Sequence, residues 1–275
     1  MMTSVDPHCR SHSLDDETAG RLISRLESRA QDAVFTRLFD CYADSLEFSD
    51  DSVTLEVGCG TGAMIRALVN KPNFRGRIVG VDQSPAFIEA ASGFADRAGI
   101  ADRVEFRVGD AHDLACASGE FGLVIAHTVI SHVVDPESAI NECARVLRPG
   151  GLLAVFDGDY SSLTYGFPED PELGRRMDRA LAETTFHNPL VMRDLIGLLP
   201  ACGFEIDDTL ADVVSEIGKA SYFKSFADTY APMVASGDMM GAGEVERWVD
   251  GQAELIAGGR FFASCNYYTY LSRLI

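Results

Sequence analysis

The chain has 275 residues, of which 47 % are hydrophobic and 24 % charged, so it can bury a full core as one large domain or as a core domain with an elaborated cap. Its 42 acidic and 23 basic residues give a formal net charge of −19, which argues against nucleic-acid and membrane-surface partners because it repels phosphate groups. The same charge keeps a protein soluble and favours cationic ligands.

The first residues are polar and include Pro7 and Gly20, so we expect residues 1–20 to be a flexible N-terminus. From Leu22 to Leu46 apolar residues recur at helical spacing, which predicts one or two amphipathic helices in a segment of residues 21–48. The N-terminus has no apolar stretch typical of a signal peptide, and the sequence has no run of about 18 apolar residues. We therefore expect a cytoplasmic protein.

Short apolar runs then alternate with helical patterns. Proline is typical of the first position of a helix, and Pro85 follows Ser84, a plausible N-cap. The alternation predicts an α/β core of residues 49–158, with a doubly wound and mostly parallel sheet. The predicted strands are residues 53–57, 77–81, 104–108, 123–126 and 152–156, and the predicted helices are residues 64–69, 86–98 and 136–147.

After Asp157 the rhythm changes. Residues 159–190 predict a loop followed by a helix that ends near Thr185, and residues 211–258 carry two further helical patterns. We interpret these two segments as a helical cap that contributes to a substrate region. Residues 191–210 and 259–275 supply a helix stopped by Pro200 and the last strands of the core sheet, at 204–210 and 261–270.

The seven cysteines are odd in number, widely scattered and without a C-x-x-C pair. This pattern argues against a disulfide framework and against a structural zinc site. No group of Asp and His residues has metal-ligand spacing either, so we expect no metal. The cysteines are Cys9, Cys41, Cys59, Cys116, Cys143, Cys202 and Cys265.

The most informative stretch is LEVGCGTG, in which Glu56 precedes three alternating glycines, Gly58, Gly60 and Gly62. Glycine is needed where the backbone turns tightly and where a ligand lies against the main chain. Taken alone, the segment also fits the looser dinucleotide pattern G-x-G-x-x-G/A, with Ala63 in the last position. An NAD-linked oxidoreductase therefore stays open on this stretch.

Carboxylates also follow the next two predicted strands. Asp82 ends the second strand, where it can accept hydrogen bonds from both hydroxyls of a ribose, as in NAD enzymes. Asp110 and Ala111 end the third strand in VEFRVGDAHDL. A dehydrogenase has no requirement for an acidic residue at this third position.

LEVGCGTG closely resembles motif I of the class I S-adenosylmethionine-dependent methyltransferases, and VGDA resembles their site for the adenine amino group. FGLVIAHTVISHV and RVLRPGGLLAVFD resemble their motifs IV and V. The resemblance covers residues 50–157 and is greatest to the ubiquinone/menaquinone-biosynthesis-like branch and to small-molecule methyltransferases of natural-product pathways. It implies a Rossmann-like fold with a seven-stranded sheet and S-adenosyl-L-methionine as cofactor.

The resemblance also implies where the cofactor lies, across the carboxyl ends of the first four strands. Gly58 and Gly60 would approach its methionine part, Asp82 its ribose, and Asp110 with Ala111 its adenine. Arg29 would pair with the methionine carboxylate or, alternatively, be a solvated helix-face arginine, and Glu56 would mainly organise the turn. The remaining residues expected at the cofactor are Cys59, Gln83 and His127.

Methyl transfer from a sulfonium is an in-line displacement, so alignment does much of the work. A general base helps where the nucleophile is a hydroxyl or an acidic carbon. The candidates are His127, His132, Asp157 and His187, against packing, capping or turn-forming roles for the last three. The aromatic residues are either core or the lining of a cavity for a flat apolar substrate. They are Tyr222, Phe223, Phe226, Tyr230, Phe261 and Phe262.

The sequence therefore predicts a methyltransferase that acts on O, C or N of a small organic molecule in secondary metabolism, as a monomer or homodimer. Three alternatives remain open. One is a cyclase or other non-methylating biosynthetic enzyme that keeps the cofactor bound. The others are a non-catalytic partner protein on the same fold and an NAD-linked oxidoreductase.

Overall fold

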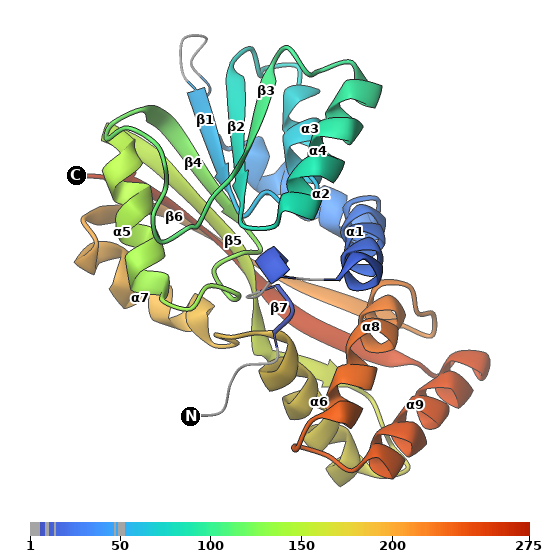
Figure 1. Ribbon diagram of the computed structural model, residues 1–275. Helices are drawn as coiled ribbons and strands as arrows, with labels where there is room; N and C mark the ends of the chain where they lie inside the picture. The colour runs from blue at the N-terminus through green and yellow to red at the C-terminus, as the bar shows by residue number, and fades with distance from the viewer. Residues whose placement is uncertain (1–5, 9–10, 14, 47, 49–52) are drawn as a thin grey trace.

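The computed structural model describes residues 6–8, 11–13, 15–46, 48 and 53–275 (Figure 1). Its centre is a seven-stranded sheet with the strand order β3-β2-β1-β4-β5-β7-β6. Strands β1 to β5 pair in parallel, and β7 runs antiparallel to both β5 and β6. The strands are β1 (Val53–Val57), β2 (Arg77–Asp82), β3 (Val104–Val108), β4 (Phe121–His127), β5 (Leu147–Tyr165), β6 (Phe204–Ile217) and β7 (Phe262–Leu274).

Helices cover both faces of this sheet (Figure 1). The helices are α1 (Asp16–Ala30), α2 (Ala33–Ala43), α3 (Ala63–Val69), α4 (Pro85–Ala98), α5 (Pro136–Val146), α6 (Pro171–Thr185), α7 (Val191–Ala201), α8 (Tyr222–Ser236) and α9 (Ala242–Ala257). Helices α2 to α4 lie on one face, α5 and α7 on the other, and α6, α8 and α9 gather beyond one end of the sheet (Figure 1).

Strand β4 shows why the sheet is sandwiched. Its residues are nearly all buried, as expected of a central parallel strand with both faces covered. Successive side chains of a strand point to opposite faces, so Ile125 joins the core that contains Leu68 of α3. Val124 joins the other core, which contains Ile140 of α5 and Leu195 of α7. The α/β, doubly wound, seven-stranded fold with a helical cap is confirmed.

The local capping signals also act as predicted at α4. The Ser84 side chain accepts a hydrogen bond from the amide of Phe87, and Pro85 occupies the first turn. Helix α7 differs from the prediction, because Pro200 lies inside its last turn rather than stopping it. The amide of Cys202 still bonds to the carbonyl of Leu198, so the helix closes one residue after the proline.

Two boundaries between core and cap are corrected by the structure. Strand β5 continues to Tyr165 and β6 to Ile217, so residues 159–165 and 211–217 are strand rather than cap. The reason is β7, whose antiparallel pairing extends along both neighbours and satisfies backbone groups far past the parallel part of the sheet.

The N-terminus is also corrected. Helix α1 begins at Asp16, and Asp15 caps it by accepting a hydrogen bond from the amide of Thr18. Ahead of it, Asp6 and Ser11 are buried, so parts of residues 1–20 pack against the rest of the protein instead of forming a flexible end. Residues 1–5, 9–10 and 14 lie outside the described part of the chain, and Cys9 is among them.

Candidate functional site

A turn of alternating glycines joins β1 to α3. Gly58, Gly60 and Gly62 have φ angles of 68°, 51° and 69°, which L side chains rarely adopt. A Cβ on Gly58 would lie 2.2 Å from Val129 Cγ2, so no other residue fits there without movement. The amides of Gly58 and Cys59 bond to the carbonyl of Val81 at 2.7 and 3.0 Å. The turn is therefore fixed against the end of β2 by its own backbone.

Asp82, the last residue of β2, also fixes this turn, through hydrogen bonds to its side chain. Its Oδ2 accepts a hydrogen bond from the amide of Gly60 at 2.8 Å, and its Oδ1 accepts one from Ser84 at 2.9 Å. Burial raises the pKa of this carboxyl, although both amide hydrogen bonds oppose that change. Each oxygen keeps a free lone pair, so Asp82 can still accept hydrogen bonds from a ligand.

Asp110 lies beyond the end of β3, beside Asp82, because the amide of Gly109 bonds to the Asp82 carbonyl at 3.0 Å. Its Oδ1 accepts hydrogen bonds from the amide and Nδ1 of His112, at 2.9 and 2.6 Å. Unlike Asp82, its side chain is exposed. Sequence reasoning did not single out His112, which is two residues from the predicted adenine site.

Glu56 is buried in β1, directly under the turn, and its Oε2 has no hydrogen-bond partner among the described residues. Burial and then the nearby Asp82 charge raise the pKa of this carboxyl well above its usual range. A buried polar atom without a partner is unfavourable, and a ligand donor such as an ammonium group would satisfy it.

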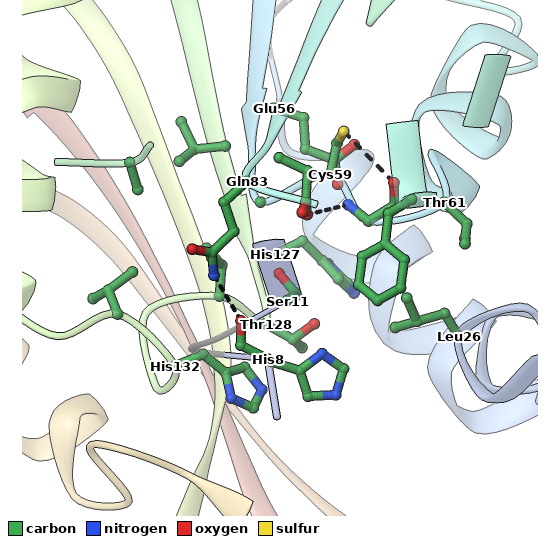
Figure 2. Close-up of a pocket in the computed structure, with 18 of the residues that line it drawn as sticks. His8, Ser11, Leu26, Glu56, Cys59, Thr61, Gln83, His127, Thr128 and His132 are labelled. Carbon is green, nitrogen blue, oxygen red and sulfur yellow. Dashed lines mark hydrogen bonds between the residues drawn. The ribbon is translucent and has the colours of Figure 1, made fainter. Parts of the chain in front are cut away.

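These residues line a cavity of about 910 Å³ at the carboxyl ends of β1 to β4 (Figure 2). That size suits a ligand the size of a nucleoside cofactor with room for a second molecule. Every residue that the sequence predicted at the cofactor lines it. They are Arg29, Glu56, Gly58, Cys59, Gly60, Asp82, Gln83, Asp110, Ala111 and His127.

Arg29 reaches the cavity from α1 and donates a hydrogen bond from Nη2 to Thr128 Oγ1 at 2.6 Å. Thr128 follows β4 and has a φ angle of 53°; among the described residues it is the one non-glycine residue with positive φ. Backbone strain of this kind is concentrated at functional sites. Arg29 and Thr128 therefore form one corner of the cavity.

His127, at the end of β4, is a buried and hydrogen-bonded part of the wall. Its Nδ1 lies 2.7 Å from the hydroxyl of Tyr42, and its ring stacks on Phe156 with centroids 4.7 Å apart. Burial, with a smaller effect of the Arg29 charge, lowers the pKa of His127 well below its usual range. His127 is thus a neutral residue of the cavity wall, and Tyr42, which sequence reasoning missed, fixes its ring.

Asp157 and His187 do not line the cavity, which corrects their expected place facing a substrate. Asp157 is fully buried and accepts hydrogen bonds from the amides of Ser131 and Gly158 and from the hydroxyl of Tyr160. His187 is attached through its backbone amide, and its Nδ1 is buried without a partner among the described residues. For Asp157 the reason is the length of β5, which places this residue in the middle of a strand.

His132 lines the cavity and is the predicted candidate base that the structure places best. Its Nδ1 lies 2.8 Å from Oδ2 of Asp6. The His8 ring lies beside it, with centroids 4.6 Å apart, and Figure 2 shows the two rings together below the glycine turn. Asp6 and His8 were missed because a polar N-terminal stretch carries no helical or strand pattern. Pro7, which lies between them, was used only as a sign of a flexible N-terminus.

The opposite wall is aromatic and was predicted in part. Tyr222, Phe226 and Tyr230 line the cavity from α8, whereas Phe223 and Phe261 belong to the core and Phe262 is partly exposed. The guanidinium of Arg25, from α1, lies 5.3 to 5.5 Å from the ring centroids of the three lining residues. Its Nη1 donates to the hydroxyl of Ser225 at 3.0 Å.

Two further observations concern the chain as a whole. In the ranges that the structure describes, no group of three or more His, Cys, Asp and Glu residues could hold a metal ion. Within the same ranges, no helix is both long and apolar enough to cross a membrane.

The family model for a methyltransferase domain matches residues 55–155, which include the glycine turn and the strand ends described above. An uncharacterized 37.1 kDa protein in a transposon of Streptomyces fradiae is 29 % identical over 84 % of this chain and 65 % of its own length. The 27-O-demethylrifamycin SV methyltransferase of Amycolatopsis mediterranei is 32 % identical over 56 % of each chain. The chain thus spans between about half and two thirds of these relatives.

A solved structure of geranyl diphosphate C-methyltransferase from Streptomyces coelicolor is similar in fold. It has a TM-score of 0.55 and 16 % sequence identity, and the match covers 87 % of this chain and 80 % of that one. The matching domain contains the whole glycine turn and leads into Phe156 at the end of the parallel sheet. Residues 55–155 therefore form a methyltransferase domain, and the chain is similar to class I S-adenosylmethionine-dependent methyltransferases.

Proposed function

We propose that this protein is an S-adenosylmethionine-dependent methyltransferase that transfers a methyl group to a small organic molecule. The observation that carries the proposal is the joint presence, in one cavity, of the glycine turn and of Asp82 and Asp110. A cofactor with a methionine end, a ribose and an adenine needs these three features in this order across the strand ends.

The residues present fit that cofactor. Gly58 and Gly60 give backbone without a Cβ against which the methionine part can lie, and the unpartnered Oε2 of Glu56 can accept from its ammonium group. Asp82 would accept from the ribose hydroxyls, and Asp110 from the adenine amino group. Arg29 would bind the methionine carboxylate. When bound, the cofactor supplies an activated methyl group on a positively charged sulfur.

The protein's own contribution is to bind, orient and enclose. The acceptor side is the aromatic wall of Phe186, Tyr222, Phe226 and Tyr230, which suits a flat and largely apolar molecule. We assign residues 166–190 and 218–258 to this acceptor side, together with the described residues 6–8 and 11–13. Of the four proposed acid–base groups, His132 is the one that we keep as a base.

Calorimetry with S-adenosylhomocysteine tests the cofactor assignment on wild type and on Asp82→Asn. We expect binding by the wild type and an affinity about 10- to 100-fold lower in the variant, because an amide can accept through only one of its two heteroatoms. The exposed Asp102→Asn is the matched control and should bind as the wild type does. Stabilisation by NAD without any by S-adenosylhomocysteine would revive an oxidoreductase.

Incubation with candidate acceptors separates the remaining alternatives. A methyltransferase forms one S-adenosylhomocysteine for each methylated product. Product formed without S-adenosylhomocysteine would identify a cyclase or another non-methylating enzyme. Failure to bind S-adenosylmethionine at all would support a non-catalytic partner protein.

A further inference from the structure

The described N-terminal residues form a strap across the cavity, which we define as residues 6–8 and 11–13. The Asp6 carboxylate accepts hydrogen bonds from the amides of His8 and His187, at 2.8 and 3.1 Å. The carbonyl of His8 accepts one from Nε2 of Gln83 at 2.7 Å, and Figure 2 draws this bond. The strap is therefore attached to elements far apart in the sequence.

The strap is also attached through side chains that line the cavity. Nε2 of His8 lies 3.0 Å from the hydroxyl of Tyr230, on α8. Nδ1 of His132 lies 2.8 Å from Oδ2 of Asp6, whose side chain has no exposed surface. Since an ionised carboxylate only accepts hydrogen bonds, this contact requires the proton of neutral His132 to be on Nδ1.

The contact therefore decides what His132 can do. With the proton held on Nδ1, the ring keeps the lone pair of Nε2, and His132 lines the cavity. A carboxylate that fixes the tautomer and orientation of a histidine is the arrangement that makes it an effective general base. Here, however, the carboxylate comes from a segment outside the methyltransferase domain of residues 55–155.

We propose that Asp6 is a positioning residue that orients His132 as the general base, and that the acceptor it deprotonates is a hydroxyl compound, an alcohol or phenol. This inference rests on the proposed function. A hydroxyl must lose its proton as it becomes an ether, whereas a neutral amine can attack with its lone pair first. The strap is thus part of the active site.

The step balances in atoms and charge. The hydroxyl oxygen forms the new bond to the methyl carbon and gives its proton to Nε2 of His132. The sulfur keeps the electron pair of the bond that breaks, so its positive charge is lost and appears on the imidazolium, beside the Asp6 carboxylate. The ring then releases the proton to solvent before the next turnover.

Two other histidines at the cavity are held by hydrogen bonds to tyrosines. His127 is bonded to Tyr42, and His8 to Tyr230. Burial, and then the neighbouring His132, lower the pKa of His8 to about 3, so His8 adds no charge at neutral pH.

For His132, burial acts to lower the pKa, but Asp6 and Asp157 outweigh it and the net change is upward. The charged and titratable groups that face His132 are Asp6 and His8 on the strap, Asp157 on β5, Arg29 on α1 and Asp82 on β2.

Nitrogen-15 NMR of the six histidine side chains tests the dyad without any acceptor. A His132→Gln variant identifies the His132 signals. In the wild type we expect neutral His132 to carry its proton on Nδ1 and to titrate above its usual pKa. In Asp6→Asn we expect the pKa to fall. Tyr230→Phe is the matched control, because it releases the strap at His8 but keeps the Asp6–His132 contact, and its His132 pKa should not change.

A wild-type tautomer protonated on Nε2 would overturn the proposal without the need for any variant. An equal fall of the pKa in Asp6→Asn and Tyr230→Phe would also overturn it, since strap docking rather than the carboxylate would then set the titration. Calorimetry with S-adenosylhomocysteine on the same samples separates this failure from that of the proposed function, because cofactor binding does not need the dyad.

Turnover supplies the second readout, with simple phenols and naphthols and the matching anilines and naphthylamines as probes. We expect methylation of hydroxyl compounds, a loss on the order of 10²-fold in His132→Gln, and a smaller loss in Asp6→Asn. The acidic limb of the pH profile should move to lower pH in Asp6→Asn, because the base without its carboxylate has a lower pKa. Turnover confined to the amines, or an unchanged pH profile in Asp6→Asn, would contradict the assignment.

Discussion

The wall of the cavity beneath β1 to β3 consists of backbone and short acidic side chains, whereas the opposite wall consists of aromatic rings and the histidines His8, His12 and His132. The first wall comes from residues 56–61, 82–83 and 110–111, which lie at the ends of three successive strands. The second joins the strap, Arg25, Phe186 and α8. Their parts are held by contacts such as His8 to Tyr230, which are 222 residues apart.

This difference indicates that the first wall serves the cofactor and the second wall serves the acceptor. The first wall has little conformational freedom, because positive φ angles and amide hydrogen bonds fix its backbone. The second wall depends on packing between distant segments, which can change without moving the turn. Substitutions on the two walls should therefore have separable effects on cofactor and acceptor.

The largest effect is expected from Gly58→Ala on the first wall. The new Cβ would meet Val129 and also force a side chain into positive φ, so we expect a loss of about 2–4 kcal/mol in the free energy of unfolding. The affinity for S-adenosylhomocysteine should fall with it. Chemical denaturation and calorimetry measure the two effects.

Gly99→Ala is the matched control, because Gly99 has a φ of 68° but nothing within 4 Å of its added Cβ. It should cost about 1–2 kcal/mol through backbone strain alone and leave cofactor affinity unchanged. A cost of Gly58→Ala no greater than that of Gly99→Ala would mean that the turn is looser than its geometry indicates.

An intermediate effect is expected from Phe226→Leu on the aromatic wall. The Phe226 ring stacks on Phe186 with centroids 6.0 Å apart and lies under Arg25. We expect a loss of about 1–2 kcal/mol in the free energy of unfolding and a higher KM for acceptors. The affinity for S-adenosylhomocysteine should stay within about twofold of wild type. Denaturation, acceptor kinetics and calorimetry provide these three values.

Phe74→Leu is the control for that substitution, because Phe74 is equally buried but does not line the cavity. It should lower stability by a similar amount and leave the KM for acceptors unchanged. Equal effects of the two variants on KM would show that loss of packing, rather than the wall itself, affects the acceptor.

The smallest effect on ligand binding is expected from Asp178→Asn in α6, which supports the aromatic wall from behind. Asp178 Oδ1 accepts the amide of Tyr165 at 2.9 Å, and burial raises the pKa of this carboxyl from 3.8 to about 7. The folded protein thus holds a proton that the unfolded chain releases from about pH 4 upward. The contribution of Asp178 to stability is full below pH 4 and is lost as the pH rises through 7.

Asp178→Asn removes this titration, so its stability relative to wild type should increase between pH 4 and pH 8, by up to about 4 kcal/mol at about 1.4 kcal/mol for each unit of pKa shift. Urea denaturation at a series of pH values measures the difference. The exposed Glu172→Gln on the same helix should show no such trend. A constant difference between Asp178→Asn and wild type at all pH values would mean that Asp178 is ionised in the folded protein.

The first wall could be predicted because its chemistry is local. Gly58, Gly60 and Gly62 follow a strand directly, and Asp82 and Asp110 end the next two strands, so parallel pairing alone brings them to one edge. The second wall could be predicted only as a set of aromatic residues at helical spacing. Which of them line the cavity depends on how α8 rotates against the sheet.

The acid–base groups show the same limit. No residue near His132 in the sequence predicts its contact with Asp6, which lies 126 positions away. The polar residues around Asp6 predicted a flexible N-terminus instead. Asp157 was expected at a strand end, but β7 extends β5 past it, and three donors occupy its carboxylate. The Asp6–His132 contact and the pairing of β5 with β7 both join residues that are far apart in the sequence.

The sequence by itself determined the alternation of strands and helices, the glycine turn and the carboxylates at the strand ends, because hydrophobic period and backbone conformation are properties of neighbouring residues. The tertiary structure alone decided how far β5 and β6 extend, which aromatic rings face the cavity and which carboxylate meets His132. These depend on contacts between segments that are far apart in the sequence, and burial and hydrogen bonding at such contacts exist only once the chain has folded.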